Sequence, residues 1–186
     1  MIVVNILIVL KSLFLAAFVF ILGYIAFIMW SFRHTVPFVP TPKRVIRQMI
    51  ELADIKANEK ICDLGSGTGR IILAVAQKHK KSLVVGIEKS PTLRLVSRLI
   101  LFFHPFIKGR ISIVNRDFFN ADLSQFDVIL CFLTPEGLRI LAPKFQALKS
   151  GSRIISYMFP LEEHLNYSET AEHLSVKDSI YIYKKL

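Results

Sequence analysis

The sequence predicts a doubly wound α/β fold with a mostly parallel sheet, preceded by one apolar N-terminal helix. Two observations support this fold class: short apolar segments alternate with amphipathic segments, and a glycine-rich loop follows the first of them after the N-terminal region. Strands that alternate with helices form a parallel sheet with helices on both faces. The 186 residues leave room for one domain of ordinary size and one appendage.

The N-terminal region is the most apolar part of a chain whose hydrophobic content is 53%. Leu13–Trp30 is an unbroken run of 18 non-polar residues, and as a helix it covers roughly 27 Å, close to the hydrocarbon thickness of a bilayer. A cleaved signal peptide is the alternative, but its basic start, shorter apolar stretch and small-residue cleavage site are not evident. We therefore expect a transmembrane anchor over residues 1–32.

Basic residues are more frequent after the apolar run Leu13–Trp30 than before it. Lys11 and the terminal amine precede the span, whereas four basic residues follow it, namely Arg33, Lys43, Arg44 and Arg47. By the positive-inside rule, the chain is expected to be a single-pass membrane protein whose main domain lies on the cytoplasmic or an equivalent face.

A proline-rich connector and a lead-in helix are expected over residues 33–55, before a main domain over 56–186. Prolines at 37, 40 and 42 hold the backbone extended and prevent the N-terminal helix from continuing. Thr41 and Pro42 form an N-cap and first-turn pair, which predicts a helix over Pro42–Ala53.

Apolar periodicity and capping signals predict the remaining elements. Strands are expected at Lys60–Leu64, Leu83–Glu88, Ile111–Asn115, Asp127–Phe132 and Arg153–Tyr157. Helices are expected at Gly69–Gln77, at Pro91–Phe103 after Ser90, and at Pro135–Leu148 after Thr134. A closing hairpin is expected from His173–Lys177 and Ile180–Tyr183.

The net charge of +10 raises the question of nucleic-acid binding. The Lys and Arg residues are scattered rather than clustered, and a basic face on anionic lipid explains them equally well, so no nucleic-acid partner is expected. Cys62 and Cys131 lie in apolar, strand-like segments, which favours reduced core cysteines over a disulfide or a zinc site. The five histidines show no pairing that indicates a metal, and none is expected.

The loop Asp63–Arg70 is the first candidate binding site, because ligands of open α/β sheets bind beyond the carboxyl ends of the strands. Its spacing is G-x-G-x-G with an acidic residue two positions earlier, whereas dinucleotide sites run G-x-G-x-x-G. A carboxylate at Asp63 suits the cationic amine and sulfonium of S-adenosylmethionine better than a pyrophosphate. The predicted cofactor-binding residues of this loop are Asp63, Gly65, Ser66, Gly67, Gly69 and Arg70.

Two further carboxylates follow successive strands. Glu88 ends the second strand and is placed to accept hydrogen bonds from ribose hydroxyls. Asp117 follows the third strand and could accept from an adenine amino group while Phe118 or Phe119 packs on the ring. Singly, each could be an ordinary surface or turn residue, but their order at successive strand ends predicts S-adenosylmethionine binding.

Several of these segments resemble the ATP synthase c-subunit lysine methyltransferase family and related small prokaryotic protein-lysine methyltransferases. The resembling segments are Val36–Pro42, Asp63–Arg70, Asp117–Phe119 and Ser156–Phe159. The resemblance implies a Rossmann-like class I methyltransferase with a seven-stranded sheet, S-adenosylmethionine as cofactor, lysine amines as acceptors and a hydrophobic N-terminus in membrane-bound members.

Two features depart from the family. Thr68 stands where an acidic residue is expected, and the helix Thr92–Phe103 is unusually apolar. We expect the apolar residues of that helix to lie in the core, with lipid contact as the alternative.

The substrate slot is expected to bind a neutral amine, whose attack on a sulfonium methyl requires alignment and desolvation more than a strong base. The resemblance and the strand-end positions suggest as slot residues Phe38, Pro40, Thr41, Phe132, Thr134, Ser156 and Tyr157. The Asn-Pro-Pro-aromatic motif of amide- and base-modifying N-methyltransferases is absent after the fourth predicted strand, where Cys131–Pro135 stands instead.

The sequence therefore predicts a membrane-anchored methyltransferase that modifies a lysine of a membrane-associated protein. Two alternatives remain open: a methyltransferase for a membrane-soluble small molecule such as a quinone or lipid precursor, and an S-adenosylmethionine-binding module without turnover.

Overall fold

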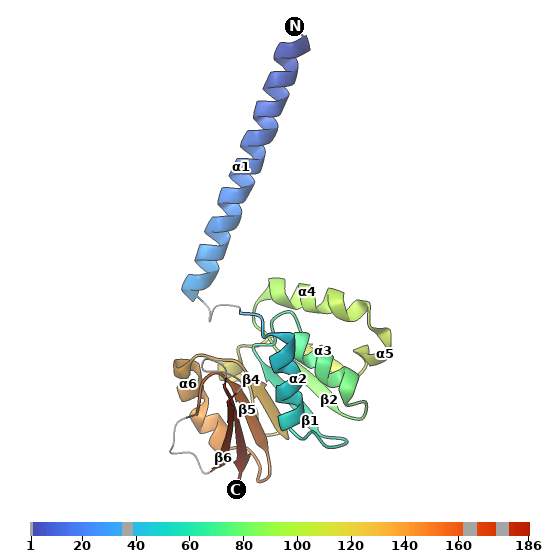
Figure 1. Ribbon diagram of the computed structural model, residues 1–186, viewed down its shortest axis with the longest axis vertical. Coiled ribbons are helices and arrows are strands. Elements are labelled where there is room, and N and C mark those ends of the chain that lie inside the picture. Colours follow the sequence, from blue (N-terminus) through green and yellow to red (C-terminus); the bar gives the residue numbers. More distant parts are fainter. Residues whose placement is uncertain (1, 35–38, 162–166, 174–178) are drawn as a thin grey trace. The chain divides into compact units, whose positions relative to one another are not determined.

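The computed structural model describes residues 2–34, 39–161, 167–173 and 179–186, and the side chains of the first helix from residue 10 to residue 26. The chain forms two compact units, Met1–Val39 and Pro40–Leu186 (Figure 1). The predicted slot residue Phe38 lies outside the described residues.

The first unit contains one long helix, α1 (Ile2–His34). Its large apolar side chains between Leu10 and Ile25 are exposed. Among the residues that the structure describes, no helix is long and apolar enough to cross a membrane. The predicted run to Trp30 extends beyond residue 26, the last α1 residue whose side chain is described, and the predicted transmembrane anchor is therefore not confirmed.

The second unit is built on a seven-stranded sheet in the order β3-β2-β1-β4-β5-β7-β6. The strands are β1 (Lys60–Leu64), β2 (Leu83–Ile87), β3 (Ile111–Val114), β4 (Val128–Cys131), β5 (Arg153–Tyr157), β6 (Tyr167–His173) and β7 (Ser179–Lys185). The first five are parallel, while β7 lies antiparallel between β5 and β6. The predicted doubly wound, mostly parallel fold is confirmed.

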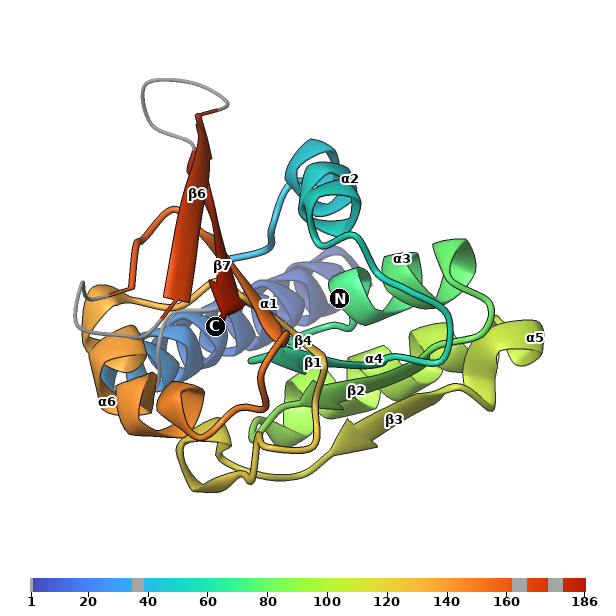
Figure 2. The same cartoon turned by 90° about the horizontal axis from the view of Figure 1, so that it is seen from below.

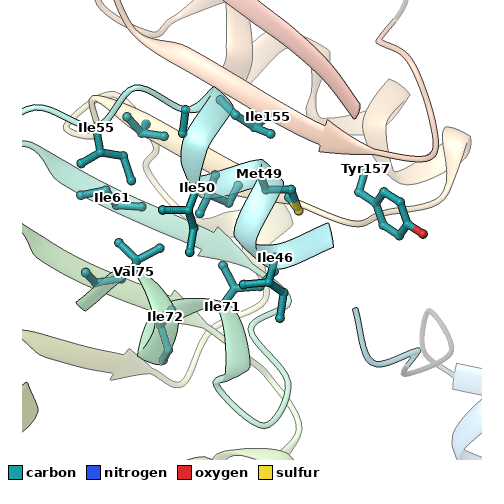
Figure 3. Packing of buried hydrophobic residues seen from close by; sticks show 14 of the residues in the cluster. Ile46, Met49, Ile50, Ile55, Ile61, Ile71, Ile72, Val75, Ile155 and Tyr157 are labelled. Carbon is teal, nitrogen blue, oxygen red and sulfur yellow. The ribbon is translucent and has the colours of Figure 1, made fainter. Parts of the chain in front are cut away.

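Helices cover both faces of this sheet (Figure 2). They are α2 (Lys43–Leu52), α3 (Arg70–Lys78), α4 (Pro91–Phe102), α5 (Pro105–Lys108) and α6 (Pro135–Gln146), with a 3-10 turn η1 (Phe118–Asn120) after β3. On one face, α2 and α3 pack Met49, Ile50 and Ile72 against the strands (Figure 3). On the other, α6 packs Leu141 and Phe145 against Ile129. Burying apolar area on both faces is what drives this layered arrangement.

Most predicted elements are confirmed within one or two residues, but several details are wrong. Pro42, rather than Thr41, is the N-cap of α2, and no side chain caps that helix. The first strand of the hairpin is Tyr167–His173 rather than His173–Lys177, of which residues 174–177 lie outside the described part. The short elements α5 and η1 were not predicted, because single turns carry little periodicity.

The predicted burial of the apolar helix is also wrong. On α4 only Ser97 and Leu101 are buried, whereas Leu95, Leu99 and Phe102 are exposed. The helix therefore presents most of its apolar side chains outward.

Candidate cofactor and substrate site

The glycine loop joins β1 to α3 at the carboxyl edge of the sheet. Gly65, Gly67 and Gly69 have φ values of 73°, 53° and 82°, which glycine adopts without a Cβ clash. The backbone N–H groups of Gly65 and Ser66 both donate to the Ile87 carbonyl, at 2.9 and 3.1 Å. These bonds hold the loop against the end of β2, directly beside Glu88.

Asp63 is a carboxyl group buried under this loop. It is 2% exposed, and its Oδ2 has no hydrogen-bond partner among the described residues. Burial, and then the neighbouring charge of Glu88, raise the pKa of Asp63 to about 8. A cation beside Oδ2 would satisfy both the charge and the missing hydrogen bond, so the predicted role of Asp63 toward the amine of S-adenosylmethionine fits this environment.

Glu88 connects the glycine loop to the start of α4. Its Oε2 accepts from the Gly67 N–H at 2.9 Å, and its Oε1 accepts from the Ser90 N–H at 2.8 Å. A carboxylate has about four acceptor positions, so Glu88 retains capacity for the ribose hydroxyls that the sequence predicted as its partners. Its structural role in fixing the loop was not predicted.

Asp117 and Phe118 follow β3 on the same edge. Asp117 Oδ1 accepts from the Phe119 N–H at 3.1 Å and its Oδ2 lies 3.2 Å from Lys89 Nζ, so it caps η1 and pairs with a cation. Phe118 is mostly buried, and its ring centroid lies 4.5 Å from that of Phe119. A Cβ at Gly65 would lie 3.7 Å from the Phe118 ring, so Phe118 borders the loop. Arg70, the first residue of α3, is half-buried.

Two residues of this site, Gly86 and Ser97, were not predicted. A Cβ at Gly86 would lie 2.6 Å from Ser66 Oγ, and a Cβ at Gly69 would clash with Ser97 Oγ of α4. The Oγ atoms of Ser66 and Ser97 have no hydrogen-bond partner among the described residues. A glycine inside a strand is a sequence signal for close backbone approach and could have identified Gly86, but a serine within an apolar helix gives no such signal for Ser97.

The predicted substrate-slot residues are only partly brought together. The rings of Phe132 and Tyr157, at the ends of β4 and β5, lie with centroids 4.7 Å apart. Tyr157 is 3% exposed and its hydroxyl points away from the packed cluster of α2 and α3 (Figure 3). Thr41 is buried, whereas Pro40 is exposed.

The other two slot residues have local structural roles. Ser156 Oγ donates to the Phe159 carbonyl at 2.6 Å, and Thr134 Oγ1 accepts from the Gly137 N–H at 3.3 Å as the N-cap of α6. Met158, which lies between Ser156 and Phe159, has a φ of 71°, which is unusual for a side chain of its size. The positive φ marks the turn after β5 as locally strained.

Cys62 and Cys131 are free and buried in β1 and β4. Burial raises the pKa of Cys131 to about 12, which keeps this thiol protonated and unreactive. Within the described residues, no group of three or more His, Cys, Asp and Glu side chains could hold a metal ion.

Comparisons with known proteins converge on one family. The profile of the ANTKMT methyltransferase domain matches residues 63–167, from Asp63 to the start of β6. A protein-lysine N-methyltransferase of Saccharolobus islandicus is 36% identical over 127 residues, which are 68% of this chain and 78% of that protein. The lysine N-methyltransferase of the ATP synthase c-subunit from Rattus norvegicus is 26% identical over 148 residues, which are 79% of this chain but 65% of that protein.

Among solved structures, an RNA methyltransferase from Salinibacter ruber in complex with S-adenosyl-L-homocysteine has a TM-score of 0.70 and 31% identity, and the match covers 78% of this chain and 93% of that one. The family resemblance read from the sequence is thus confirmed, together with the class I fold and the cofactor. The chain belongs to the ANTKMT methyltransferase domain family of S-adenosylmethionine-dependent methyltransferases.

Proposed function

We propose that this enzyme transfers a methyl group from S-adenosylmethionine to the side-chain amine of a lysine in a membrane-associated protein. The observation that carries the proposal is the family match over residues 63–167, which contains the glycine loop, Glu88, Asp117 and the ends of β4 and β5. Two relatives that match 68% and 79% of this chain are named for lysine methylation.

The chemistry requires little from the protein beyond binding and desolvation. Bound S-adenosylmethionine supplies a methyl group on a sulfonium; as the lysine nitrogen lone pair forms the N–C bond, the C–S bond breaks and its electrons stay on sulfur. The lysine proton leaves to solvent before the attack. Phe132 and Tyr157 supply an aromatic wall at the strand ends, and an apolar wall lowers the pKa of an entering amine.

We place the enzyme at a membrane through α1. The run Leu13–Trp30 has the length of a bilayer span, and the described apolar side chains of α1 are exposed, as lipid contact requires. The excess of Lys and Arg after the run favours a position of the second unit, Pro40–Leu186, on the cytoplasmic or an equivalent face, and we refer to this unit as the catalytic unit. A membrane-associated protein is then the nearest class of substrate.

The experiment is methylation of solubilised host membranes with the full chain and radiolabelled S-adenosylmethionine, followed by separation of protein, lipid and RNA. Label in a protein band, absent with an Asp63→Ala control, supports the proposal, and peptide mapping then identifies the residue. Label only in the lipid extract would instead indicate a membrane-soluble small molecule.

Two other outcomes would also overturn the proposal. Label only in RNA would align the enzyme with the Salinibacter ruber protein. Cofactor binding without transfer to any fraction would indicate a binding module.

A further inference from the structure

The catalytic unit exposes an apolar surface that the cofactor site does not use. We define the α4–α5 face by its exposed apolar and basic side chains, which are Leu95, Leu99, Phe102, Phe103, Phe106, Arg98 and Lys108. Leu99 is 59% exposed and Phe106 is 97% exposed. Soluble proteins seldom expose large apolar side chains in such a group unless the surface binds something.

The charge of this segment has one sign. Between Glu88 and Asp117 the sequence contains six Lys and Arg residues and no Asp or Glu. Lys108 Nζ lies 6.0 Å from the centroid of the Phe102 ring, so cation and aromatic ring share one place on the surface. Lys89 pairs with Asp117, but Arg98 and Lys108 lie among the exposed apolar side chains, so the face suits a partner that is both apolar and anionic.

A groove lined in part by residues of the face has the same character. Its volume is about 370 Å³, and its lining combines Arg98 and Lys108 with Leu101, Phe102 and Ile113. The two cations could bind a phosphate group, and the apolar side chains could contact a hydrocarbon chain attached to it.

We propose that the α4–α5 face docks on an anionic lipid bilayer. Phe102, Phe103 and Phe106 enter the boundary between headgroups and acyl chains, while Arg98 and Lys108 meet lipid phosphates. This is the behaviour of amphipathic helices at membrane surfaces, where apolar burial and attraction to anionic lipid add together. RNA would use the cations and stack on the rings, but it offers no apolar environment for Leu95 and Leu99.

Docking of this face does not depend on which molecule accepts the methyl group. It concerns the catalytic unit, in addition to any contact that α1 makes. α4 begins three residues after Glu88, so the helix that carries part of the face starts at the cofactor edge of the sheet.

The test uses the full chain in vesicles, with tryptophan as a depth probe. Trp30, the single tryptophan, is replaced by Phe, and Phe106→Trp is introduced. Vesicles contain acyl-chain-brominated phosphatidylcholine, either alone or with an equal part of phosphatidylglycerol. A tryptophan on α6, Ile140→Trp, is the matched control because Ile140 is 49% exposed on another helix.

We expect bromine to quench most of the emission at position 106 in the anionic vesicles, with less quenching in phosphatidylcholine alone and little at position 140. Adding Arg98→Glu and Lys108→Glu to the Phe106→Trp chain should abolish the quenching. A Leu99→Trp chain repeats the measurement on α4 should the Phe106→Trp chain fail to fold.

Several results would overturn the proposal. Equal quenching at positions 106 and 140 would exclude specific docking of this face. Quenching that does not change with lipid charge or with charge reversal would exclude an anionic lipid surface as the partner. Emission at 106 that responds to protein concentration, or to RNA but not to lipid, assigns the face to a second copy or to a nucleic acid. Emission at 106 that is unquenched in every vesicle would mean that the face does not enter the bilayer.

Discussion

Asp63 shows how a single residue can point to a ligand. An acidic side chain at the end of a buried strand would ordinarily pair with a cation or with backbone N–H groups, because an isolated buried charge is costly. Its Oδ2 has no partner among the described residues, and burial raises its pKa to about 8. A cationic ligand beside Oδ2 would supply the missing hydrogen bond and favour the charged form of Asp63.

Cofactor affinity should depend on pH through Asp63. In the free protein Asp63 is largely protonated below about pH 8, so binding a cation requires loss of that proton. Affinity for S-adenosylmethionine should rise with pH by up to about tenfold per unit until pH 8. In Asp63→Asn the affinity should fall by about tenfold or more, as expected for a lost bond to a charged group.

Calorimetric titration from pH 6 to pH 9 measures both effects. The Asp63→Asn chain should keep only the pH dependence that comes from the ligand's own amine. Stability provides an independent check. The pKa of the Asp63 carboxyl is near 3.8 in the unfolded chain and about 8 in the folded one. The free energy of unfolding should therefore fall as the pH rises from about 4 to 8, and it should level off above pH 8. An identical pH profile in the two chains would be incompatible with this role of Asp63.

A second residue-scale prediction concerns Gly86. A Cβ there would lie 2.6 Å from Ser66 Oγ and 2.8 Å from Ser66 Cβ, so Ser66 and the glycine loop must move. Gly86→Ala should lower the free energy of unfolding by about 1–3 kcal/mol and weaken cofactor binding. Gly109→Ala is the control, because a Cβ at Gly109 meets nothing within 4 Å. Unchanged cofactor affinity in Gly86→Ala would argue against a close approach of β2 to the loop.

At the scale of elements, the start of α6 shows a structural role for Thr134, which the sequence predicted as a slot residue. Thr134 Oγ1 accepts from the Gly137 N–H and caps this helix. Thr134→Ala should lower the free energy of unfolding by about 1 kcal/mol, and Thr134→Ser should restore most of it. Denaturant unfolding in detergent measures the loss. A large fall in methyl transfer by Thr134→Ser, with stability intact, would show instead that the side chain contacts the substrate.

Elements with strong local signals were predictable, and those defined by long-range packing were not. The caps Ser90 and Thr134 and the strand Arg153–Tyr157 agree with the structure because each depends on neighbouring residues. The exposure of Leu99 depends on what the rest of the chain places against α4, which apolar periodicity does not encode. For the same reason, Ser97 beside Gly69 gave no signal.

At the scale of the whole molecule, Arg153 joins distant parts of the catalytic unit. Its Nε donates to the Ala53 carbonyl at 2.8 Å, and its Nη2 donates to Glu59 Oε2 at 2.6 Å, with both charged side chains mostly buried. Arg153→Ala should lower the free energy of unfolding by about 3 kcal/mol, because it leaves the mostly buried Glu59 without its cationic partner and with only the Lys56 N–H as a donor. Arg139→Ala, which breaks the exposed pair with Glu136, should cost far less. Equal losses in thermal or denaturant unfolding would contradict this assignment.

The global architecture followed from the alternation of strands and helices, while the strand order at one edge did not. Placing β7 between β5 and β6 requires a contact between β5 and the last strand of the chain, and no local pattern specifies it. At the cofactor site, the loop, Glu88 and Asp117 were predictable because they follow successive strands that are parallel. The partners that occupy Glu88 and Asp117 became known only from the fold.

The most direct test of lysine methylation uses membranes whose lysine amines have first been blocked by reductive dimethylation. The full chain and radiolabelled S-adenosylmethionine are added to blocked and to unblocked membranes, and label in protein is compared. Label that appears in unblocked membranes and is lost on blocking is the predicted result. Undiminished label in the blocked membranes would mean that the acceptor is not a lysine amine.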